Sequence, residues 1–457
     1  MAKTLQDVKD TADARLAQGD LLGALKVYRL VLEGAPLDFE LRLQIGDLLA
    51  GLKALPYAAE VYKSVAIHCI KAGNPFLALT AIKRIELFRG NVRALTDGLI
   101  ETYTAGSPRI GRGVKQAPAE YSRKVRDDLD LDYPIETEVL IAAMAHLAAN
   151  LADIQNYPSI VPAVPIFSSL KREGFAALLG RLELRQYGPG EAIIRQGDAG
   201  QSVFFLARGE VRVVRIVQDA VGAKSEVQLA RLGQGSLFGE MALVSADPRS
   251  ASVVCDTPVD ALELTRESIE TLAQSIPDVA EAMARFTRER MINNLLATNP
   301  LFAPFDEEGG KKLLARFTGH EVPAKTVFLE EGTAGNGLYV ILQGQAEVLK
   351  WDPNAEEHVA LATLGPGDVA GEISLVLEEP VSATVRTTTK STLLFLAREL
   401  FRPLVESVPD LLVHFNRLAN QRLIDTESKL MRPTVIDPFT PEEKGFDRLD
   451  DDDLVFI

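Results

Sequence analysis

The sequence FGEMALVSADPRSASV at residues 238–253 and the sequence AGEISLVLEEPVSATV at residues 370–385 are two versions of one pattern. We call them the first and second cassettes. Each has Gly-Glu, an aliphatic run, a proline and small residues that lead into an apolar strand. Glycine, glutamate and proline are all unfavourable inside a core strand. The pattern instead favours a pocket, and its recurrence with the same internal spacing indicates a duplicated domain.

The duplication extends well beyond the cassettes. Matching positions in the two copies are separated by a constant number of residues before a single loop, and by a slightly smaller constant number after it. This is expected for a tandem repeat with a short deletion in that loop. The matched pairs include Pro165 and Pro300, Gly197 and Gly332, Gly209 and Gly344, Gly233 and Gly365, and Pro277 and Pro409. Within each copy, short alternating strands are separated by glycine turns and flanked by helices. This predicts two antiparallel jelly-roll β-barrels with flanking helices, at residues 163–296 and 297–430.

The first 105 residues have a different, helical pattern. Apolar residues recur at helical spacing, and glycine or proline interrupts them about every dozen residues. Ala24 and Tyr28 recur as Ala58 and Tyr62 after 34 residues, which is the period of tetratricopeptide repeats. We therefore expect a multidomain α plus α+β chain that begins with tetratricopeptide-like helical hairpins. These hairpins either bind a protein partner on a concave surface or serve only as a packing domain.

Three further segments complete the expected organisation. A mobile linker is expected at 106–135 because charged residues and chain breakers dominate there, and a connecting helix is expected at 136–162. An acidic flexible tail is expected at 431–457.

Composition excludes several classes of partner and site. The formal net charge is −15, so the chain repels nucleic acid and anionic lipid, and no segment is apolar and long enough to predict a membrane span. Cys69 and Cys255 lie far apart without metal-ligand spacing, which favours a reducing cytoplasm. The five histidines are dispersed, and known catalytic motifs are missing, so we expect no metal, no cofactor and no catalytic residue.

The first cassette fits the chemistry of a cyclic mononucleotide, which carries one phosphate charge, one free ribose hydroxyl and a flat base. Gly239 starts a short helix, where unpaired backbone N–H groups favour an anion and the missing side chain allows close approach. Glu240 can accept a hydrogen bond from the ribose 2′ hydroxyl. Arg249 can place its guanidinium fork on the phosphate oxygens. The predicted site is completed by Met241, Ala242, Ser250 and Ala251.

These residues resemble the phosphate-binding cassette of the cyclic-nucleotide-binding domain family. The match comprises Phe238-Gly239-Glu240, Ala242-Leu243, Pro248-Arg249, Ala251 and Val253, together with turn glycines at 197, 209 and 233. The resemblance covers residues 163 to 430. It implies that the glutamate binds the ribose and the arginine binds the phosphate.

Two such domains in tandem resemble the regulatory subunit of cyclic-AMP-dependent kinase. The resemblance implies cyclic AMP as the ligand. Cyclic GMP remains an alternative ligand, because the hydroxyl of Ser250 can form a hydrogen bond with the guanine amino group.

The second cassette departs from the family pattern at the decisive position. Ala370 replaces the aromatic residue, and Val381 occupies the position of the arginine. Arg386 lies an odd number of residues further on, so an extended strand directs it to the other face. We expect weak or absent nucleotide binding, with a different small ligand or a structural role as alternatives. The degenerate second site comprises Gly371, Glu372, Ile373, Ser374, Val381 and Ser382.

The sequence therefore predicts a cytoplasmic, non-enzymatic receptor. The first barrel binds cyclic AMP or cyclic GMP, and the bound state is relayed to a protein partner through the N-terminal helices. One alternative is a scaffold that needs no ligand. Another is a regulatory subunit of a separate enzyme.

Overall fold

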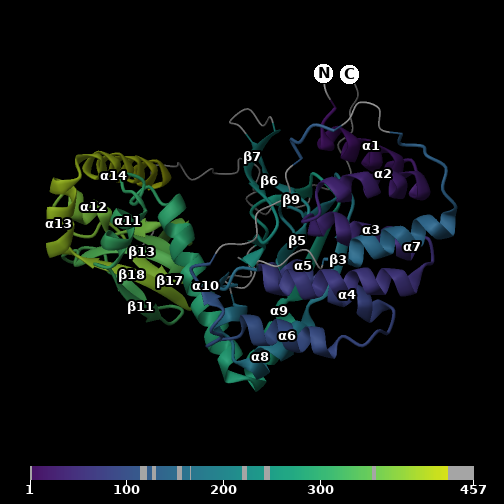
Figure 1. The fold of residues 1–457 in the computed structure, drawn as a ribbon. Coiled ribbons are helices and arrows are strands. Elements are labelled where there is room, and N and C mark those ends of the chain that lie inside the picture. Colours follow the sequence, from purple (N-terminus) through teal and green to yellow (C-terminus); the bar gives the residue numbers. More distant parts are fainter. Residues whose placement is uncertain are drawn as a thin grey trace, which may run out of the picture. The chain divides into compact units, whose positions relative to one another are not determined.

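The structure is a computed structural model with two compact units, residues 1–292 and 293–457 (Figure 1). It describes residues 3–113, 121–125, 130–151, 157–164, 166–218, 224–240, 248–352 and 357–430. The predicted acidic tail at 431–457 lies outside these residues. Within the described part of the chain, no helix is both long enough and apolar enough to cross a membrane.

The chain begins with six helices, as the sequence predicts. They are α1 Leu5–Ala17, α2 Leu21–Gly34, α3 Phe39–Gly51, α4 Leu55–Ala72, α5 Pro75–Leu87 and α6 Arg93–Tyr103. Helices α3 and α4 follow α1 and α2 at the same offset that separates Tyr62 from Tyr28 in the sequence. The Tyr28 hydroxyl donates to Asp13, and the Tyr62 hydroxyl donates to Asp47, so one tyrosine–aspartate contact occurs in both hairpins. An N-terminal helical region is thus confirmed, and its tetratricopeptide-like character stays a prediction.

Side-chain caps and prolines mark where these helices begin. Asp20 and Asp38 accept hydrogen bonds from the backbone N–H groups of Gly23 and Leu41, at 2.8 and 2.9 Å. These bonds satisfy N–H groups that have no partner inside their own helix. Helices α4 and α5 instead carry a proline in the first turn, where the missing N–H costs no hydrogen bond.

A seventh helix, α7 Thr137–Ala149, packs against α2, α3 and α4. Arg42 on α3 is 2% exposed and fixes the end of this helix. Its Nη1 donates to the carbonyl oxygens of Leu147 and Ala148 at 2.8 and 2.7 Å. A cation at a helix C-terminus satisfies carbonyl groups that lack helical partners. The predicted connecting segment is therefore part of the helical packing.

The segment before α7 also contacts the start of the chain. The Leu5 N–H donates to the Arg123 carbonyl, and the Val125 N–H donates to the Lys3 carbonyl, each at 2.9 Å. A short parallel pair joins β1 Ile110–Gly111 to β2 Val161–Pro162. Parts of the predicted linker thus make regular backbone hydrogen bonds.

The first barrel consists of two separate four-stranded antiparallel sheets, with strand orders β3-β10-β5-β8 and β4-β9-β6-β7. It is therefore an open jelly-roll arrangement. Its strands are β3 Glu183–Tyr187, β4 Ala192–Ile194, β5 Ser202–Arg208, β6 Val211–Gln218, β7 Lys224–Leu232, β8 Leu237–Phe238, β9 Ser252–Cys255 and β10 Val259–Thr265. Its helical elements are η1 Phe167–Ser169, α8 Arg172–Arg181, α9 Arg266–Ser275 and α10 Pro277–Thr298.

The second barrel repeats this topology, with strand orders β11-β18-β13-β16 and β12-β17-β14-β15. Its strands are β11 Thr318–Val322, β12 Val327–Leu329, β13 Gly337–Gln343, β14 Ala346–Asp352, β15 Glu357–Leu364, β16 Val369–Ala370, β17 Thr384–Thr387 and β18 Ser391–Ala397. Its helices are α11 Glu307–Leu314, α12 Glu372–Val376, α13 Arg398–Ser407 and α14 Pro409–Leu430. The predicted fold class is confirmed.

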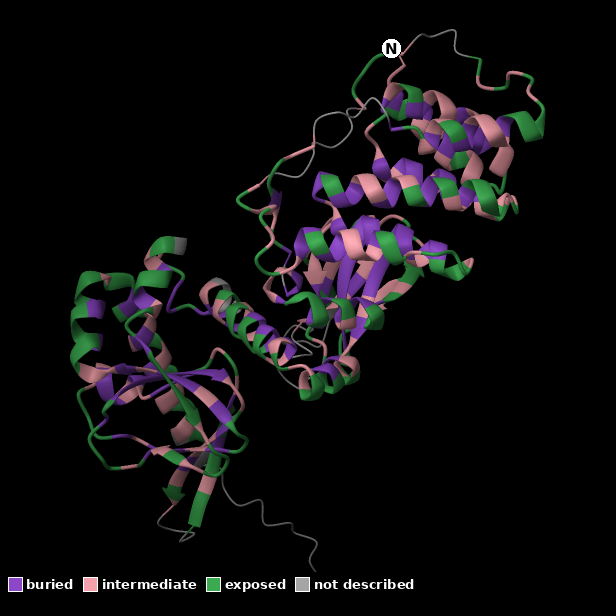
Figure 2. Ribbon diagram, turned by 60° about the horizontal axis from the view of Figure 1, so that its bottom comes forward, coloured by how far each residue is buried: buried purple, intermediate pink, exposed green. Residues whose placement is uncertain are grey.

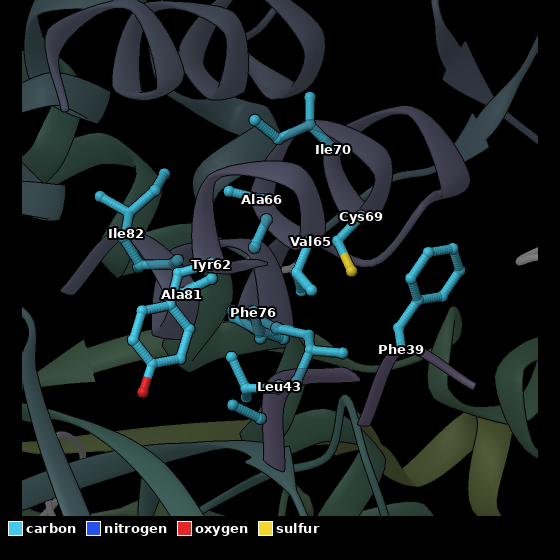
Figure 3. Packing of buried hydrophobic residues seen from close by; sticks show 14 of the residues in the cluster. Phe39, Leu43, Tyr62, Val65, Ala66, Cys69, Ile70, Phe76, Ala81 and Ile82 are labelled. Atoms are coloured by element: carbon cyan, nitrogen blue, oxygen red, sulfur yellow. The ribbon is translucent and has the colours of Figure 1, made fainter. Parts of the chain in front are cut away.

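The helical region and the first barrel share one hydrophobic core. Six successive residues of strand β5 are buried, and since successive side chains point to opposite sides, both faces of the strand are buried. Figure 2 shows buried strands, in purple, next to the N-terminal helices. Val203 and Phe205 belong to the core formed with the helices, whereas Phe204 and Leu206 fill the barrel interior. The rings of Phe76 on α5 and Phe205 are 5.0 Å apart. Figure 3 shows Phe76 among the helical core residues.

Four charged side chains join the helices to this sheet. Arg84 on α5 is 4% exposed, Asp260 on β10 is fully buried, and their side chains are 3.0 Å apart. Arg84 also contacts Asp47 on α3 at 2.6 Å. Arg208 at the end of β5 lies 2.7 Å from Asp260 and 3.2 Å from Asp47. Two guanidinium groups thus face two carboxylates, so the buried cluster has no net charge.

Replacing Asp260 with alanine would remove a carboxylate that Arg84 and Arg208 share inside the protein. Breaking a buried ion pair costs about 3–5 kcal/mol, because the remaining charge stays desolvated. We expect D260A to lower the free energy of unfolding of the first unit by that amount in a denaturant titration. R93A is the control, because Arg93 is 92% exposed and surface pairs contribute about 0–1 kcal/mol. Equal losses in the two variants would contradict this role for the cluster.

Candidate functional site

The backbone around Arg249 is fixed by the loop that precedes β5. The Arg249 N–H donates to the Asp198 carbonyl at 2.8 Å, and the Gly197 N–H donates to the Arg249 carbonyl at 2.9 Å. A single β-bridge between Ala199 and Pro248 extends this contact. Arg249 is therefore held immediately before β9, where its side chain can reach the first cassette.

The guanidinium of Arg249 reaches back to the first cassette. Its Nη1 donates to the Gly239 carbonyl at 2.8 Å, and its Nη2 donates to the Ser202 carbonyl at 2.7 Å. Gly239 has a φ of +77°, and an added Cβ there would lie 3.1 Å from Arg249 Nη1. Glycine is thus required both for the backbone conformation and for the close approach of the guanidinium.

Glu240, the next cassette residue, is in an ion pair with the helix that follows the barrel. Its Oε1 lies 2.8 Å from Arg290 Nη2 on α10, and both side chains are partly exposed. Burial lowers the pKa of the Arg249 guanidinium, and the negative charge of Glu240 opposes that effect. Glu240, Arg249 and Arg290 together carry a net charge of about +1, since arginine stays protonated in proteins. This part of an acidic chain can attract an anion.

This geometry suits an anion that also carries a hydroxyl group. A guanidinium has five N–H donors, and the two bonds of Arg249 go to neutral carbonyl oxygens. A phosphate would replace neutral acceptors with charged ones, which form shorter and stronger hydrogen bonds. The adjacent carboxylate of Glu240 is an acceptor for a hydroxyl.

The other predicted site residues are placed only in part. Met241 and Ala242 lie outside the described residues, as does the helix expected to start at Gly239. Ser250 and Ala251 lie between Arg249 and β9, and Arg215 donates to the Ser250 carbonyl at 3.1 Å. Ser250 is exposed and Ala251 is half-buried.

The second cassette has the same backbone frame with a different side chain. The Val381 N–H donates to the Thr333 carbonyl, and the Gly332 N–H donates to the Val381 carbonyl, each at 2.9 Å. These bonds match those of Arg249 position for position. Val381 is 6% exposed and belongs to the hydrophobic interior of the second barrel. Arg386 pairs with Glu347 at 2.7 Å, so the prediction that it does not replace the missing cation agrees with its contacts.

The carboxylate of the second cassette is kept and buried. Gly371 is the left-handed N-cap of α12, and Glu372 begins the helix with 1% exposure. The Ser374 hydroxyl donates to the Gly371 carbonyl at 2.9 Å. Arg422 Nη1 on α14 lies 2.6 Å from Glu372 Oε1. Glu372 and Arg422 line a pocket in the second barrel, and Ile373 and Ser382 also line it.

The sequence analysis missed the two helix arginines. Arg290 is distant in sequence from Glu240, and Arg422 is equally distant from Glu372. The duplication held the necessary signal, because the two arginines are related by the same offset as Glu240 and Glu372. Each cassette carboxylate is thus tied to the helix that follows its own barrel.

Comparison with known proteins identifies both barrels. Residues 184–275 and 320–408 match the family model described as cyclic nucleotide-binding domain. The chain therefore contains two cyclic nucleotide-binding domains in tandem, as predicted.

Curated relatives include regulatory proteins of kinases. The chain is 29% identical over 271 residues to the cAMP-dependent protein kinase regulatory subunit of Yarrowia lipolytica, which covers 59% of this chain and 67% of that protein. It is 34% identical over 136 residues to a cGMP-dependent protein kinase of Drosophila melanogaster, which covers 30% of this chain and 17% of that protein. The chain thus spans about two-thirds of the first relative and a small part of the second.

A solved structure of the regulatory domain of Toxoplasma gondii PKA with cAMP was also found. It is 23% identical, covers 55% of this chain and 90% of that chain, and has a TM-score of 0.26.

The pair of Arg422 and Glu372 allows a pH-dependent test. Burial raises the pKa of Glu372, and Arg422 opposes that shift, so removing Arg422 raises the pKa further. A carboxyl with a raised folded pKa contributes stability at low pH and loses it as the pH rises through that pKa. We expect R422A to lower the unfolding temperature more at about pH 8 than at about pH 5.

The matched control is R402A, because Arg402 is 72% exposed in its ion pairs. It should change the unfolding temperature little at either pH. Losses of equal size at both pH values in R422A would contradict a buried charge at Glu372.

Proposed function

We propose that this chain is a cyclic nucleotide receptor whose first barrel binds cyclic AMP. The observation that carries the proposal is the guanidinium of Arg249, which is held 2.8 Å from the Gly239 carbonyl of the first cassette. The phosphate binds Arg249, and the ribose hydroxyl binds Glu240. Ser250 and Ala251 line the remainder of the site, and the predicted contribution of Met241 and Ala242 lies outside the described residues.

Cyclic AMP is preferred over cyclic GMP in this proposal. The first curated relative is named as a cAMP-dependent kinase regulatory subunit, and the relative from Drosophila melanogaster as a cGMP-dependent kinase. Ser250 could bond a guanine amino group, but its side chain is exposed, and its carbonyl already bonds Arg215. Direct competition between the two nucleotides distinguishes these ligands.

The bound state is relayed through α10. Glu240 is the proposed ribose ligand and already contacts Arg290 on that helix at 2.8 Å. A ligand hydroxyl at Glu240 competes with this ion pair or strengthens it, and either effect changes how α10 packs on the barrel. A ligand shifts such an equilibrium only by its difference in affinity for the two states.

The chain acts on a protein partner in the cytoplasm and has no enzymatic activity of its own. The names of its relatives as regulatory subunits support this role. The helices at the N-terminus are the proposed partner surface. Helix α7 already covers part of α2, α3 and α4, so the partner binds the remaining helical surface or displaces α7.

Replacing Arg249 with alanine tests the proposed ligand site. Hydrogen bonds to a charged group contribute about 1.5–3 kcal/mol, which corresponds to roughly ten- to hundredfold in affinity. We expect R249A to weaken cyclic AMP binding by that factor in isothermal titration calorimetry. R231A is the matched control, because Arg231 on β7 is 66% exposed and pairs with Asp256 at 3.9 Å.

Two outcomes would refute the proposal. The first is that folded wild-type protein binds neither cyclic AMP nor cyclic GMP saturably, which would favour a scaffold that needs no ligand. The second is that R249A and R231A bind cyclic AMP as tightly as the wild type, which would place the ligand elsewhere.

A further inference from the structure

We propose that the second barrel binds an uncharged nucleoside, which Glu372 holds by its ribose hydroxyl. This site is separate from the nucleotide site proposed for the first barrel, and either can exist without the other. The shape, the charge and the polar groups of one pocket in the second unit support this site.

The pocket is a hollow with room for about one ring of a ligand, since an apolar cavity of about 150 Å³ binds benzene. Its volume is about 130 Å³, whereas a single buried water needs about 10–15 Å³. Apolar side chains from the sheet β12-β17-β14-β15 form much of its inner wall, including Leu329, Val348, Leu364 and Val385. Such a wall suits a flat heterocyclic base, because ligand pockets combine a mostly apolar lining with a few placed polar groups.

The second cassette has a smaller side chain than the first at the position before Gly-Glu. In the first barrel, Phe238 stacks on Phe204 with ring centroids 5.4 Å apart. In the second barrel, Ala370 pairs with Tyr339 in the same strand register, so a methyl group replaces a phenyl ring. Ala370 lines the pocket. The volume lost from this side chain adds to the space available for a ligand.

The charges that line this pocket disfavour a phosphate. Glu372, Arg422 and Asp425 are the charged lining residues, and together they carry a net charge of about −1. The corresponding first-site set carries about +1, because Arg249 is present and the position of Asp425 is Asn293. Val381 presents only methyl groups where Arg249 donates hydrogen bonds. An anionic ligand would therefore enter a negative pocket without a guanidinium to compensate its desolvation.

Two cations beside this pocket, Arg422 and Lys350, are already engaged in ion pairs, and a third, Arg398, donates to the Ser374 carbonyl at 2.9 Å. Arg422 contacts Glu372 at 2.6 Å. Lys350 contacts Glu331 at 2.6 Å and also donates to the Ser382 carbonyl at 2.7 Å. Using either cation for a phosphate would break one of these contacts. An uncharged ligand can bind without breaking either contact.

The polar groups of the pocket match a nucleoside. Glu372 is kept at the position that would accept the ribose hydroxyl, and it is almost completely buried. A buried carboxylate is a strong hydrogen-bond acceptor for a hydroxyl that reaches it. Asp425 and Thr426 line the pocket from α14. A carboxylate and a hydroxyl there can bond the ring N–H and amino groups of a base.

The test uses the full chain with Arg249→Ala, so that the first site is weakened and the second is measured. Adenosine and guanosine are titrated calorimetrically, beside their 2′-deoxy forms and cyclic AMP. We expect at least one nucleoside to bind saturably with one molecule per chain. It should bind at least tenfold more tightly than its 2′-deoxy form and at least tenfold more tightly than cyclic AMP.

Glu372→Gln in the same background should weaken nucleoside binding about tenfold. Its folding is checked by the unfolding temperature of the second unit, and the 2′-deoxy comparison tests the hydroxyl contact without this variant. The proposal is overturned if neither nucleoside binds. It is also overturned if cyclic AMP binds this background as tightly as the nucleoside, or if the 2′-deoxy form binds equally well.

The cyclic AMP affinity of the wild-type chain is measured in parallel. That measurement reports on the first barrel, so a failure of the nucleoside proposal is distinguishable from a failure of the proposed function.

Discussion

The proposed difference in ligand between the two barrels depends on one guanidinium. The chain as a whole has a formal charge of −15, so its long-range field opposes an approaching phosphate. Only a local cation can overcome this field, and Arg249 is placed to do so by two backbone hydrogen bonds to the loop at 197–198. Val381 has the same two backbone bonds to 332–333 and no charge. The fold thus keeps one backbone frame in both copies, and that frame presents a guanidinium in the first copy and an isopropyl group in the second.

Both cassette carboxylates are bound to an arginine on the following helix, whether or not a phosphate site is present. Glu240 contacts Arg290, and Glu372 contacts Arg422. This shared contact joins each cassette to the helix that follows its own barrel. The second barrel therefore keeps the contact through which the first barrel is proposed to respond to its ligand.

The N-terminal helices are not an independent attachment to the first barrel. Phe76 and Phe205 pack together, and Arg84 reaches Asp260 in a fully buried position of β10. In the second copy the position of Asp260 is Thr392, and that of Arg208 is Gln343, so the charged cluster belongs to the first copy alone. The first barrel sheet is therefore in direct contact with the helices proposed to bind a partner.

Local patterns predicted much of this structure. The cassette spacing and the paired glycines located both barrels, and Tyr28 and Tyr62 revealed the helical repeat. Contacts between distant segments were not visible in the same way. Asp47 and Asp260 are far apart in the sequence, and nothing near either residue indicates that two arginines lie between them. Arg290 is far from Glu240 along the chain, so only the duplication itself could have revealed that contact. The docking of α7 depends on Arg42, which looks like any surface arginine of a helix until its burial is known.

The number of cyclic AMP molecules bound per wild-type chain tests the central claim most directly. Equilibrium dialysis with radiolabelled cyclic AMP counts these sites without any substitution. We expect one tight site per chain, because Arg249 supplies a guanidinium in the first barrel and Val381 supplies none in the second. Two sites of equal affinity would contradict the account, because the second barrel would then bind a phosphate without the cation on which the account depends.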